Sequence, residues 1–285
     1  METILQNHSL ILKINHFWAE INSLLYKNRE IIYQKKENFW QRQSPVLFPI
    51  VGALKDNSYI FENQEYNLSQ HGFARDMNFL LAESTDSSAT FFLWSSEATQ
   101  KKYPFEFKLY IKYIISKNTL EAQYVIKNID SNTLYFSLGA HPAFKIWTDV
   151  EQYSFVFEKI PTEQKVDRLS GGMISPGLQE NLVDYIQDST IHLQEKYFTN
   201  DAMILRNFSE NSLDFYKKNE KIFHMSWENF PHLGIWKQPN APFICIEPWD
   251  WFADEFEQKW DFTNKWGINK LAPNTEKKYS WKLEF

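Results

Sequence analysis

The chain has 285 residues, of which 43% are hydrophobic and 17% aromatic, and it has a formal net charge of −6. This length allows a sizeable hydrophobic core, and all-β folds of this size often form one domain, so we predict a single domain over residues 1–285. No run of lysine and arginine is longer than two residues, which argues against a nucleic-acid surface and against a polybasic membrane patch.

Cysteine content and the N-terminal sequence indicate the compartment. Cys245 is the only cysteine, which excludes a disulfide framework and a cysteine-based zinc site within one chain and suits a reducing environment. The N-terminus has no basic start followed by an apolar stretch, so we expect no signal peptide. No apolar run approaches the roughly 20 residues of a membrane-spanning helix. We therefore expect a soluble, cytoplasmic protein with no membrane or nucleic-acid partner.

Apolar and polar residues alternate along much of the chain, in segments rich in aromatic and β-branched residues. In chain order, this pattern predicts strands at 9–14, 30–34, 89–94, 105–113, 120–127, 154–157 and 221–227. The alternation is nearly strict in the fourth of these, as expected for a strand with one buried and one solvated face. Turn-forming residues cluster between the strands, at 55–58, 85–88, 116–118, 128–132 and 217–220.

Two further segments are less regular. Residues 170–177 are rich in glycine and proline and are predicted to form a long loop within the domain. Residues 250–259 are predicted to form either a short helix or an irregular loop. Convincing helical periodicity is scarce along the chain. Many short strands and few helices predict an all-β fold, a large antiparallel β-sandwich or barrel.

Three short segments place titratable residues beside glycine or proline, where a strand ends or kinks and can aim a side chain into a cleft. They are HGFARD at 71–76, LGAHPAF at 138–144 and CIEPWD at 245–250. A single histidine near a turn is more often a structural residue than a catalyst. The functional interpretation therefore depends on the three segments together.

These segments, in this order and spacing, resemble the aldose 1-epimerase (galactose mutarotase-like) family, and most closely its LacX-like branch. The similar sequence also includes PVLFPIVG at 45–52, FPHLGIW at 230–236 and APFICIEPW at 241–249, so the resemblance extends over nearly the whole chain. HGFARD together with the PHLGIW and CIEPW block is a specific signature, whereas HPAF alone is weak. The resemblance implies a β-supersandwich with a concave, sugar-sized cleft on one sheet.

The resemblance also implies which residues form the site. It places a catalytic base at Glu247 and a catalytic acid at His141, with His71 donating hydrogen bonds to oxygens of the sugar. Arg75 and Asp201 resemble the family's positions that bind sugar hydroxyls, and the match at Asp201 is the looser one.

Other residues near these motifs have simpler interpretations. Trp236 and Trp249 are candidates to stack on a sugar, although core packing is the commoner role for a tryptophan in a chain that has eleven. Cys245 lies in an apolar segment and is predicted to be buried and inert. The remaining histidines show no metal-ligand spacing and no phosphate-binding loop is present, so we expect no metal and no cofactor.

Interconversion of sugar anomers needs only one base and one acid. The base removes the proton of the anomeric hydroxyl while the acid protonates the ring oxygen, and after rotation about C1–C2 the reverse transfers close the other anomer. With a pKa near 4.3, Glu247 is expected to be ionised at neutral pH, and a histidine beside it is expected to be protonated. The predicted function is therefore that of an isomerase, an aldose 1-epimerase (mutarotase) acting on an aldose or a sugar phosphate.

One position departs from the family pattern and keeps a second interpretation open. Family members often have an arginine after the first glycine, whereas this chain reads FPIVGA and has Ala53 there. Loss of that donor can weaken binding, alter sugar preference or indicate drift from mutarotase activity, although Arg75 can compensate. The alternative is a non-catalytic carbohydrate-binding or sugar-sensing module on the same fold. The sequence leaves open which sugar is bound, whether it is phosphorylated, and the oligomeric state.

Overall fold

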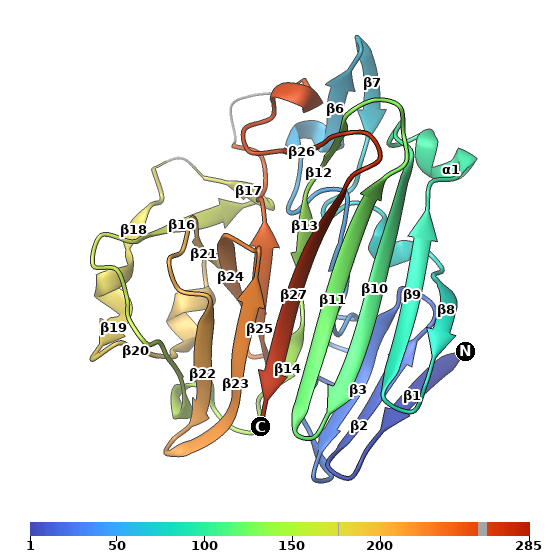
Figure 1. Ribbon diagram of the computed structural model, residues 1–285. Coiled ribbons are helices and arrows are strands. Elements are labelled where there is room, and N and C mark those ends of the chain that lie inside the picture. Colours follow the sequence, from blue (N-terminus) through green and yellow to red (C-terminus); the bar gives the residue numbers. More distant parts are fainter. Residues whose placement is uncertain (176, 256–260) are drawn as a thin grey trace.

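The computed structural model describes residues 1–175, 177–255 and 261–285, and antiparallel β-strands dominate it (Figure 1). The prediction of an all-β antiparallel sandwich is confirmed. The α-helix of the described residues, α1 (Glu97–Gln100), is a single turn that Ser96 and Thr99 cap reciprocally. Short 3-10 turns are η1 (Lys55–Asn57), η2 (Ala74–Asp76), η3 (Val150–Gln152), η4 (Leu182–Tyr185), η5 (Glu195–Phe198) and η6 (Phe262–Asn264).

The largest sheet of the described residues has ten strands, all paired antiparallel. Their order is β19 (Ile186–Gln187), β20 (Thr190–His192), β15 (Tyr153–Val156), β22 (Ser212–Lys217), β23 (Glu220–Glu228), β27 (Glu276–Glu284), β11 (Thr119–Asn128), β10 (Phe107–Ser116), β9 (Ser88–Trp94) and β8 (Leu80–Ser84). The long strands β9, β10, β11 and β27 run side by side in Figure 1. Side chains of β10 and β11 alternate between buried and partly exposed, which is the pattern that the sequence predicts.

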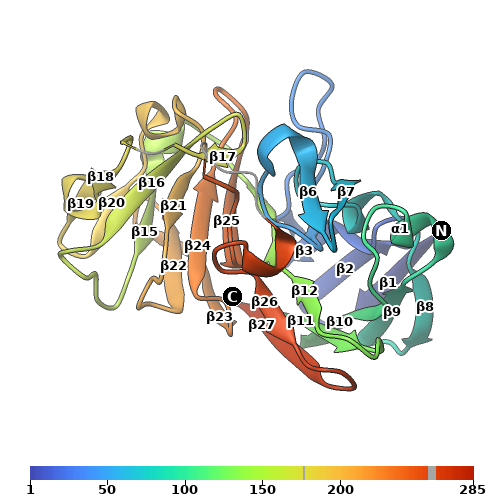
Figure 2. The ribbon, with the colours of Figure 1, turned by 90° about the horizontal axis from the view of Figure 1, so that it is seen from above.

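The second large sheet is also antiparallel and contains most of the motif residues. In the described residues its order is β17 (Met173–Ile174), β16 (Lys165–Ser170), β21 (Met203–Leu205), β24 (His232–Trp236), β25 (Phe243–Asp250), β13 (Leu138–Ala140) and β5 (Val46–Leu47), with β14 (Ala143–Lys145) beside β25 and β18 (Glu180–Asn181) beside β16. Seen from above, β24 and β25 stand next to β22 and β23 of the ten-stranded sheet (Figure 2). β25 is buried along its whole length.

The two large sheets pack face to face through an extended apolar core. Ile244 and Ile246 of β25 point into this core. Phe223 of β23 joins them there, and its ring lies 4.6 Å from the ring of Phe144 on β14. Trp249 of β25 belongs instead to a small cluster on the opposite face of the second sheet. Both faces of β25 are therefore covered, one by the core between the sheets and the other by the small cluster that contains Trp249.

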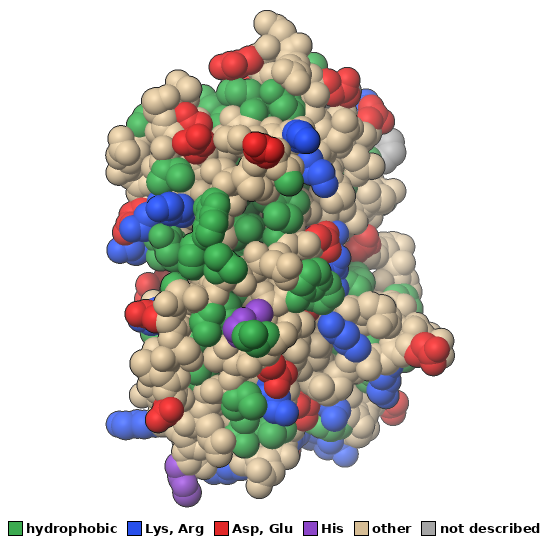
Figure 3. All heavy atoms as spheres, turned by 90° about the vertical axis from the view of Figure 1, so that its right-hand side faces the viewer, with side chains coloured by type: hydrophobic (Ala, Val, Ile, Leu, Met, Phe, Trp, Pro, Cys, Tyr) green, Lys and Arg blue, Asp and Glu red, His purple; other side chains and the backbone are tan. Residues whose placement is uncertain are grey.

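Smaller sheets complete the fold. They are β1 (Glu2–Gln6), β2 (Leu10–Asn15), β3 (Glu20–Tyr26) and β4 (Arg29–Glu30) in one sheet, β6 (Ser58–Phe61) with β7 (Gln64–Asn67), and β12 (Leu134–Phe136) with β26 (Asn269–Leu271). The hydroxyl of Tyr113 on β10 donates a 2.8 Å hydrogen bond to the carbonyl of Ala19, which ties the N-terminal sheet to the large one. Figure 3 shows hydrophobic and charged side chains interspersed on the face to the right in Figure 1.

Most predicted strands coincide with β2, β9, β10, β11, β15 and β23. The exception is 30–34, where only β4 (Arg29–Glu30) is a strand and Ile32 makes a single isolated bridge to Phe144. The amides of Tyr33 and Lys145 donate to the carbonyls of Ala143 and Ile31 on either side of this bridge, so the segment pairs with β14 over too few residues to form a regular strand. No helix of the described residues is long and apolar enough to cross a membrane.

One of the two loop predictions is revised, and for the other the structure shows the irregular alternative as far as residue 255. The predicted long loop at 170–177 contains the tight β16–β17 hairpin, because Gly171 and Gly172 adopt positive φ angles of 59° and 77° at its turn. Residue 176 lies outside the described residues. In the segment 250–259, Asp250 ends β25 and the chain to residue 255 is irregular, while 256–260 lie outside the described residues.

Candidate active site

All six residues predicted for the site line one cavity of about 460 Å³. They come from widely separated parts of the chain. His71 lies just before η2 and Arg75 within it, His141 lies between β13 and β14, Asp201 precedes β21, Trp236 is on β24 and Glu247 is on β25. The fold thus brings the predicted residues together. Their roles in a reaction stay predictions.

Glu247 reaches the cavity because alternate residues of β25 turn away from the core. Its neighbour across the strand pair is Gly234 of β24, and Trp249, two residues further along, lines the same cavity. A β-carbon on Gly234 or on Gly139 of β13 would lie 2.7 Å from the indole of Trp249. Glycine is therefore required on both flanking strands for this indole to lie beside the carboxyl group.

His141 and Glu247 are the closest pair of titratable groups in this cavity. Nε2 of His141 lies 3.1 Å from Oε2 of Glu247, and only 7% and 1% of the two side chains are exposed. The contact forms because β13 and β14, on either side of His141, both pair with β25. Among the described residues, neither oxygen of Glu247 nor Nδ1 of His141 makes a hydrogen bond of good geometry, although the indole of Trp249 interacts with the carboxyl group. Buried polar atoms left in this way are unfavourable, and ligand hydroxyls would satisfy them.

Burial overturns the charge states expected for this pair. Complete removal from water raises the pKa of Glu247 well above its ordinary value, and the nearby Asp201 adds to the effect. Burial, followed by the charge of Arg75, lowers the pKa of His141 to about 3. The electrostatics of the buried site therefore oppose the expectation of an ionised Glu247 beside a protonated His141, because desolvation of two charges outweighs their attraction. Both pKa shifts favour the neutral pair, with the shared proton on the carboxyl group.

His71 is held by an unusual backbone conformation. Its φ angle is 66°, and that of Gly72 is 70°, where a β-carbon would lie 2.2 Å from a backbone oxygen. Nδ1 of His71 accepts a 3.1 Å hydrogen bond from the amide of Gly52, which leaves Nε2 to hold the proton of the neutral ring. Burial and then the neighbouring His141 lower the pKa of His71 well below its ordinary value. His71 is therefore a neutral hydrogen-bond donor.

Arg75 and Asp201 bring opposite charges to the cavity. Arg75 donates a 2.6 Å hydrogen bond to the carbonyl of Gln70, and its Nε has no partner among the described residues. Burial, and then the charge of Arg42, lowers the pKa of Arg75 to about 10, so this group stays charged at neutral pH. Asp201 accepts a 2.8 Å hydrogen bond from the amide of Ala202, and burial raises its pKa.

Ala53 lies behind the cavity wall. Its amide donates to the carbonyl of Gly172 at 2.9 Å, and its carbonyl accepts from the amide of Asp254 at 3.0 Å. The side chain of Gln70 lies against Gly172 and lines the cavity, whereas Ala53 does not. The β16–β17 hairpin and Gln70 therefore fill the region where the family pattern would place an arginine.

Sequence reasoning missed several residues that line the cavity. Trp40, in the connection between β4 and β5, stacks on the ring of His141, with centroids 4.7 Å apart and planes 29° apart. No motif surrounds it, and a tryptophan within a polar segment is the only signal. Gln70 directly precedes HGFARD, and that adjacency could have identified it. Phe198 and Thr199, at the end of η5, carry no comparable signal.

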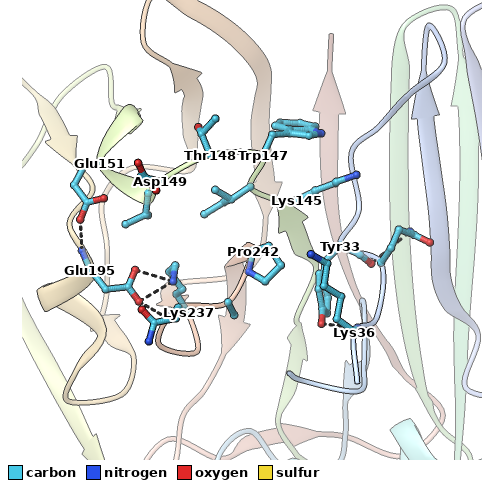
Figure 4. Close-up of a pocket in the computed structure, with 15 residues that line it drawn as sticks. Tyr33, Lys36, Lys145, Trp147, Thr148, Asp149, Glu151, Glu195, Lys237 and Pro242 are labelled. Atoms are coloured by element: carbon cyan, nitrogen blue, oxygen red, sulfur yellow. Dashed lines mark hydrogen bonds and ion pairs between the residues drawn. The ribbon is translucent and has the colours of Figure 1, made fainter. Parts of the chain in front are cut away.

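A second, larger cavity of about 590 Å³ borders the loop between β24 and β25 (Figure 4). The same loop also borders the first cavity. Pro239 faces the first cavity, whereas Lys237 and Asn240 line the second. Charged groups here already bind one another: the ammonium of Lys237 donates to Glu195 at 2.8 Å, and the same carboxylate accepts from the amide of Asn240. No histidine is among the described residues that line it. The first cavity is therefore the candidate active site.

The fold and the site together define an antiparallel β-supersandwich with a cavity of sugar size that titratable and aromatic side chains line together. Residues 2–277 match the aldose 1-epimerase family, and the chain belongs to that family. The plasmid form of protein LacX from Lactococcus lactis subsp. lactis is 25% identical over 98% of this chain and 97% of the relative. The resemblance inferred from the motifs is thus confirmed.

Solved structures agree with this assignment. A galactose mutarotase related enzyme from Lactobacillus acidophilus superposes with a TM-score of 0.91 at 30% identity, covering 100% of this chain and 97% of the other. A galactose mutarotase-like protein from Lactobacillus casei ATCC 334 gives a TM-score of 0.90 at 27% identity, covering 100% and 99%. The likeness covers all of this chain, so it includes every segment that builds the cavity.

Proposed function

We propose that this protein is an aldose 1-epimerase that interconverts the α and β anomers of an aldose or a sugar phosphate. One observation supports this more than any other: Nε2 of His141 lies 3.1 Å from Oε2 of Glu247 in a sugar-sized cavity, and neither carboxyl oxygen makes a hydrogen bond of good geometry among the described residues. Ring opening needs an acid and a base at one site. Membership of the family supports the same reaction class.

The two residues exchange a proton before the sugar ring opens. The pKa shifts of the pair favour a proton on Glu247, and its transfer across the 3.1 Å contact gives a carboxylate and an imidazolium. The carboxylate then takes the proton of the anomeric hydroxyl, and the imidazolium protonates the ring oxygen as the bond from C1 to that oxygen breaks. The open-chain aldehyde therefore faces a neutral carboxyl group and a neutral imidazole, the same protonation state as the free pair.

The same residues close the ring of the other anomer. After rotation about C1–C2, Glu247 returns a proton to the carbonyl oxygen while His141 accepts the proton of the attacking hydroxyl. His71, with its proton on Nε2, donates to the oxygen on which negative charge develops. Arg75 and Asp201 bind the remaining hydroxyls. Protons balance over the cycle without a metal, nucleotide or covalent intermediate.

A non-catalytic sugar-binding or sugar-sensing module is the second candidate function. Ala53 favours it, since the cavity lacks the arginine that family members often have and relies on Arg75 and the indole of Trp236 to hold a sugar. A pure binder has no need of a carboxyl group and an imidazole in contact. For this reason the enzyme is the function that the site supports better.

The proposal extends to the setting of the protein. The apolar core draws on residues from Leu5 to Leu283, which supports one domain over 1–285. Cys245 is a single buried thiol, which suits a cytoplasmic protein. A small-molecule sugar is the partner that we expect, with no nucleic acid and no membrane.

Anomerisation rates over a panel of aldoses and hexose 6-phosphates test the proposal. Each sugar is dissolved as a single anomer and followed by polarimetry or NMR exchange spectroscopy, with the spontaneous rate subtracted. We expect acceleration of at least one sugar, unchanged by a chelator. Sugar binding without acceleration of any member of the panel would establish the binding module instead. Activity lost with a chelator and restored by a divalent ion would refute the cofactor-free mechanism.

A further inference from the structure

His141 lacks the hydrogen bond that commonly orients an acid–base histidine. In such residues one ring nitrogen reacts while the other is bonded to a carboxylate or a backbone carbonyl that sets the ring plane. Here Nε2 faces Glu247, and Nδ1 has no hydrogen bond of good geometry to another of the described residues, the one backbone interaction of the ring being with His141 itself. Packing is therefore the main constraint on the orientation of this imidazole.

Trp40 supplies the closest aromatic contact to this ring. The indole and the imidazole are stacked, with centroids 4.7 Å apart and an interplanar angle of 29°. Trp236 and His71 meet the same imidazole nearly perpendicular, at 5.8 Å and 5.7 Å. Of these three contacts, the stacked one covers the face of the imidazole. It therefore resists rotation of the ring out of its plane more than the two edge contacts do.

Trp40 is itself held in place by the surrounding protein. Its indole packs at 5.7 Å against the ring of Phe243 and meets the ring of Trp236 at 5.4 Å with an interplanar angle of 74°. Two residues further along the chain, the guanidinium of Arg42 donates a 2.9 Å hydrogen bond to the carbonyl of Arg75. The segment that carries Trp40 is thus tied to the segment that carries a predicted sugar-binding residue.

The stacked indole also acts on the charge of His141. Burial, then Arg75 and, less strongly, Arg42 lower the pKa of this histidine and oppose the imidazolium form. The face of an indole carries partial negative charge and attracts a cation placed over it. Because ring opening passes through the imidazolium, this contact offsets part of the penalty at the step where the charge is needed.

We propose that Trp40 is a positioning residue of the active site, whose indole face sets the ring plane of His141 and stabilises its protonated form. This inference rests on the proposed function for its kinetic consequences. A role as a sugar-stacking platform is the competing assignment, and the contact opposes it, because His141 already covers one face of the indole.

Substitution of Trp40 separates these roles. Trp40→Leu removes the stack, and we expect kcat to fall about tenfold, as for loss of one desolvated cation–π contact. We expect KM to stay within about twofold, since the ground-state contacts to sugar remain, and the solvent deuterium isotope effect to rise. Trp40→Phe keeps a ring over His141 and should recover most of kcat. Trp94→Leu is the matched control, because Trp94 stacks on Phe92 at 5.0 Å and 26° on β9, outside the cavity.

Two kinetic results would overturn the proposal. A rise in KM with unchanged kcat would make Trp40 a sugar-contact residue. An unchanged kcat in a folded Trp40→Leu protein, no different from Trp94→Leu, would leave Trp40 without a role in the reaction. If Trp40→Leu does not fold, the comparison of Trp40→Phe with the parent tests the proposal instead. Phenylalanine keeps a ring over His141, so a loss of kcat in Trp40→Phe as large as that of a catalytic substitution would contradict a stacking role.

NMR of histidine-labelled protein gives a readout that needs no activity. We expect the ring protons of His141 to be shifted upfield by the indole in the parent and in Trp40→Phe, with one sharp set of signals. In Trp40→Leu the shift should vanish and the signals should broaden. Absence of the upfield shift in the parent would refute the stacking. A parent that shows the shift but anomerises no sugar would refute the proposed function alone.

Discussion

β10 and β25 are both long strands within large antiparallel sheets, yet they differ in what covers them. Side chains of β10 alternate between buried and partly exposed, so that Ile111 is in the core while 39% of the Lys112 side chain is exposed. β25 is buried at every position, with Ile246 in the core and Glu247 in the cavity. Only the strand that is covered on both faces can hold a carboxyl group away from water, and that is the strand on which the site is built.

The largest effect is expected on the cavity face of β25. Glu247→Gln removes the base and His141→Asn removes the acid, and each should lower the anomerisation rate by roughly 10²–10⁴-fold. Sugar binding should weaken much less, because Arg75 and Asp201 remain. Polarimetry and equilibrium binding measure the two quantities. Glu276→Gln, on the exposed end of β27, is the control that should leave both unchanged. Full activity in both cavity variants would end the assignment of base and acid.

The adjacent residue on the core face should behave in the opposite way. Ile246→Ala empties part of the inter-sheet core, so we expect the free energy of unfolding to fall by about 2–5 kcal/mol. The rate per folded molecule should change little, because Ile246 does not line the cavity. Urea unfolding and active-site-normalised rates test this. If the folded Ile246→Ala protein lost its activity, the two faces of β25 would not be independent.

Buried histidines should make the fold sensitive to acid. Burial lowers the pKa of His141 and of His232 to about 3, from 6.5 in the unfolded chain. The unfolded chain therefore binds more protons, and stability should fall as the pH drops from 6.5 toward 3, by at most about 1.4 kcal/mol per pH unit for each such histidine. The raised pKa of Glu247 has the opposite sign, since its contribution is lost as the pH rises above 4.5.

Urea midpoints measured over this pH range test the effect. His232 is the better probe, because it is buried outside the cavity, where its Nδ1 accepts a 2.9 Å hydrogen bond from the amide of Asn207. His232→Gln should lower the free energy of unfolding at neutral pH and make it depend less steeply on pH. The exposed His192→Gln should leave the slope as it is. If the free energy of unfolding of His232→Gln fell with pH as steeply as that of the parent, folding would not lower the pKa of His232.

A smaller effect is expected where β24 accommodates the indole of Trp249. In Gly234→Ala the new methyl group would lie 2.7 Å from that ring, and we expect a loss of about 1–3 kcal/mol in stability together with weaker sugar binding as the indole moves. Calorimetry and a binding titration measure the two. Gly171→Ala, at the open tip of the β16–β17 hairpin, strains the backbone without touching the cavity and should leave the sugar affinity unchanged.

The smallest effect is expected on the solvated face of β10. Lys112 lies 3.7 Å from Glu83 in an exposed ion pair, and Lys112→Gln should change the free energy of unfolding by less than about 0.5 kcal/mol. The rate of anomerisation should not change. A larger loss in urea unfolding would show that this face is covered in solution, and the contrast with β25 would then no longer hold.

The sequence by itself determined the all-β class and the family. Period-two alternation in 105–113 and 120–127 records contact with water on one face, and that signal is local. The motifs located His71, His141 and Glu247 through their resemblance to the family, and the positive φ angle of Gly72 beside His71 is a local requirement that the sequence records. Only the tertiary structure decided the remaining features. The contact of Trp40 with His141 and the shifted pKa values of His141 and Glu247 depend on residues far apart in the chain that close around one cavity. The loss of water there depends on all of them at once.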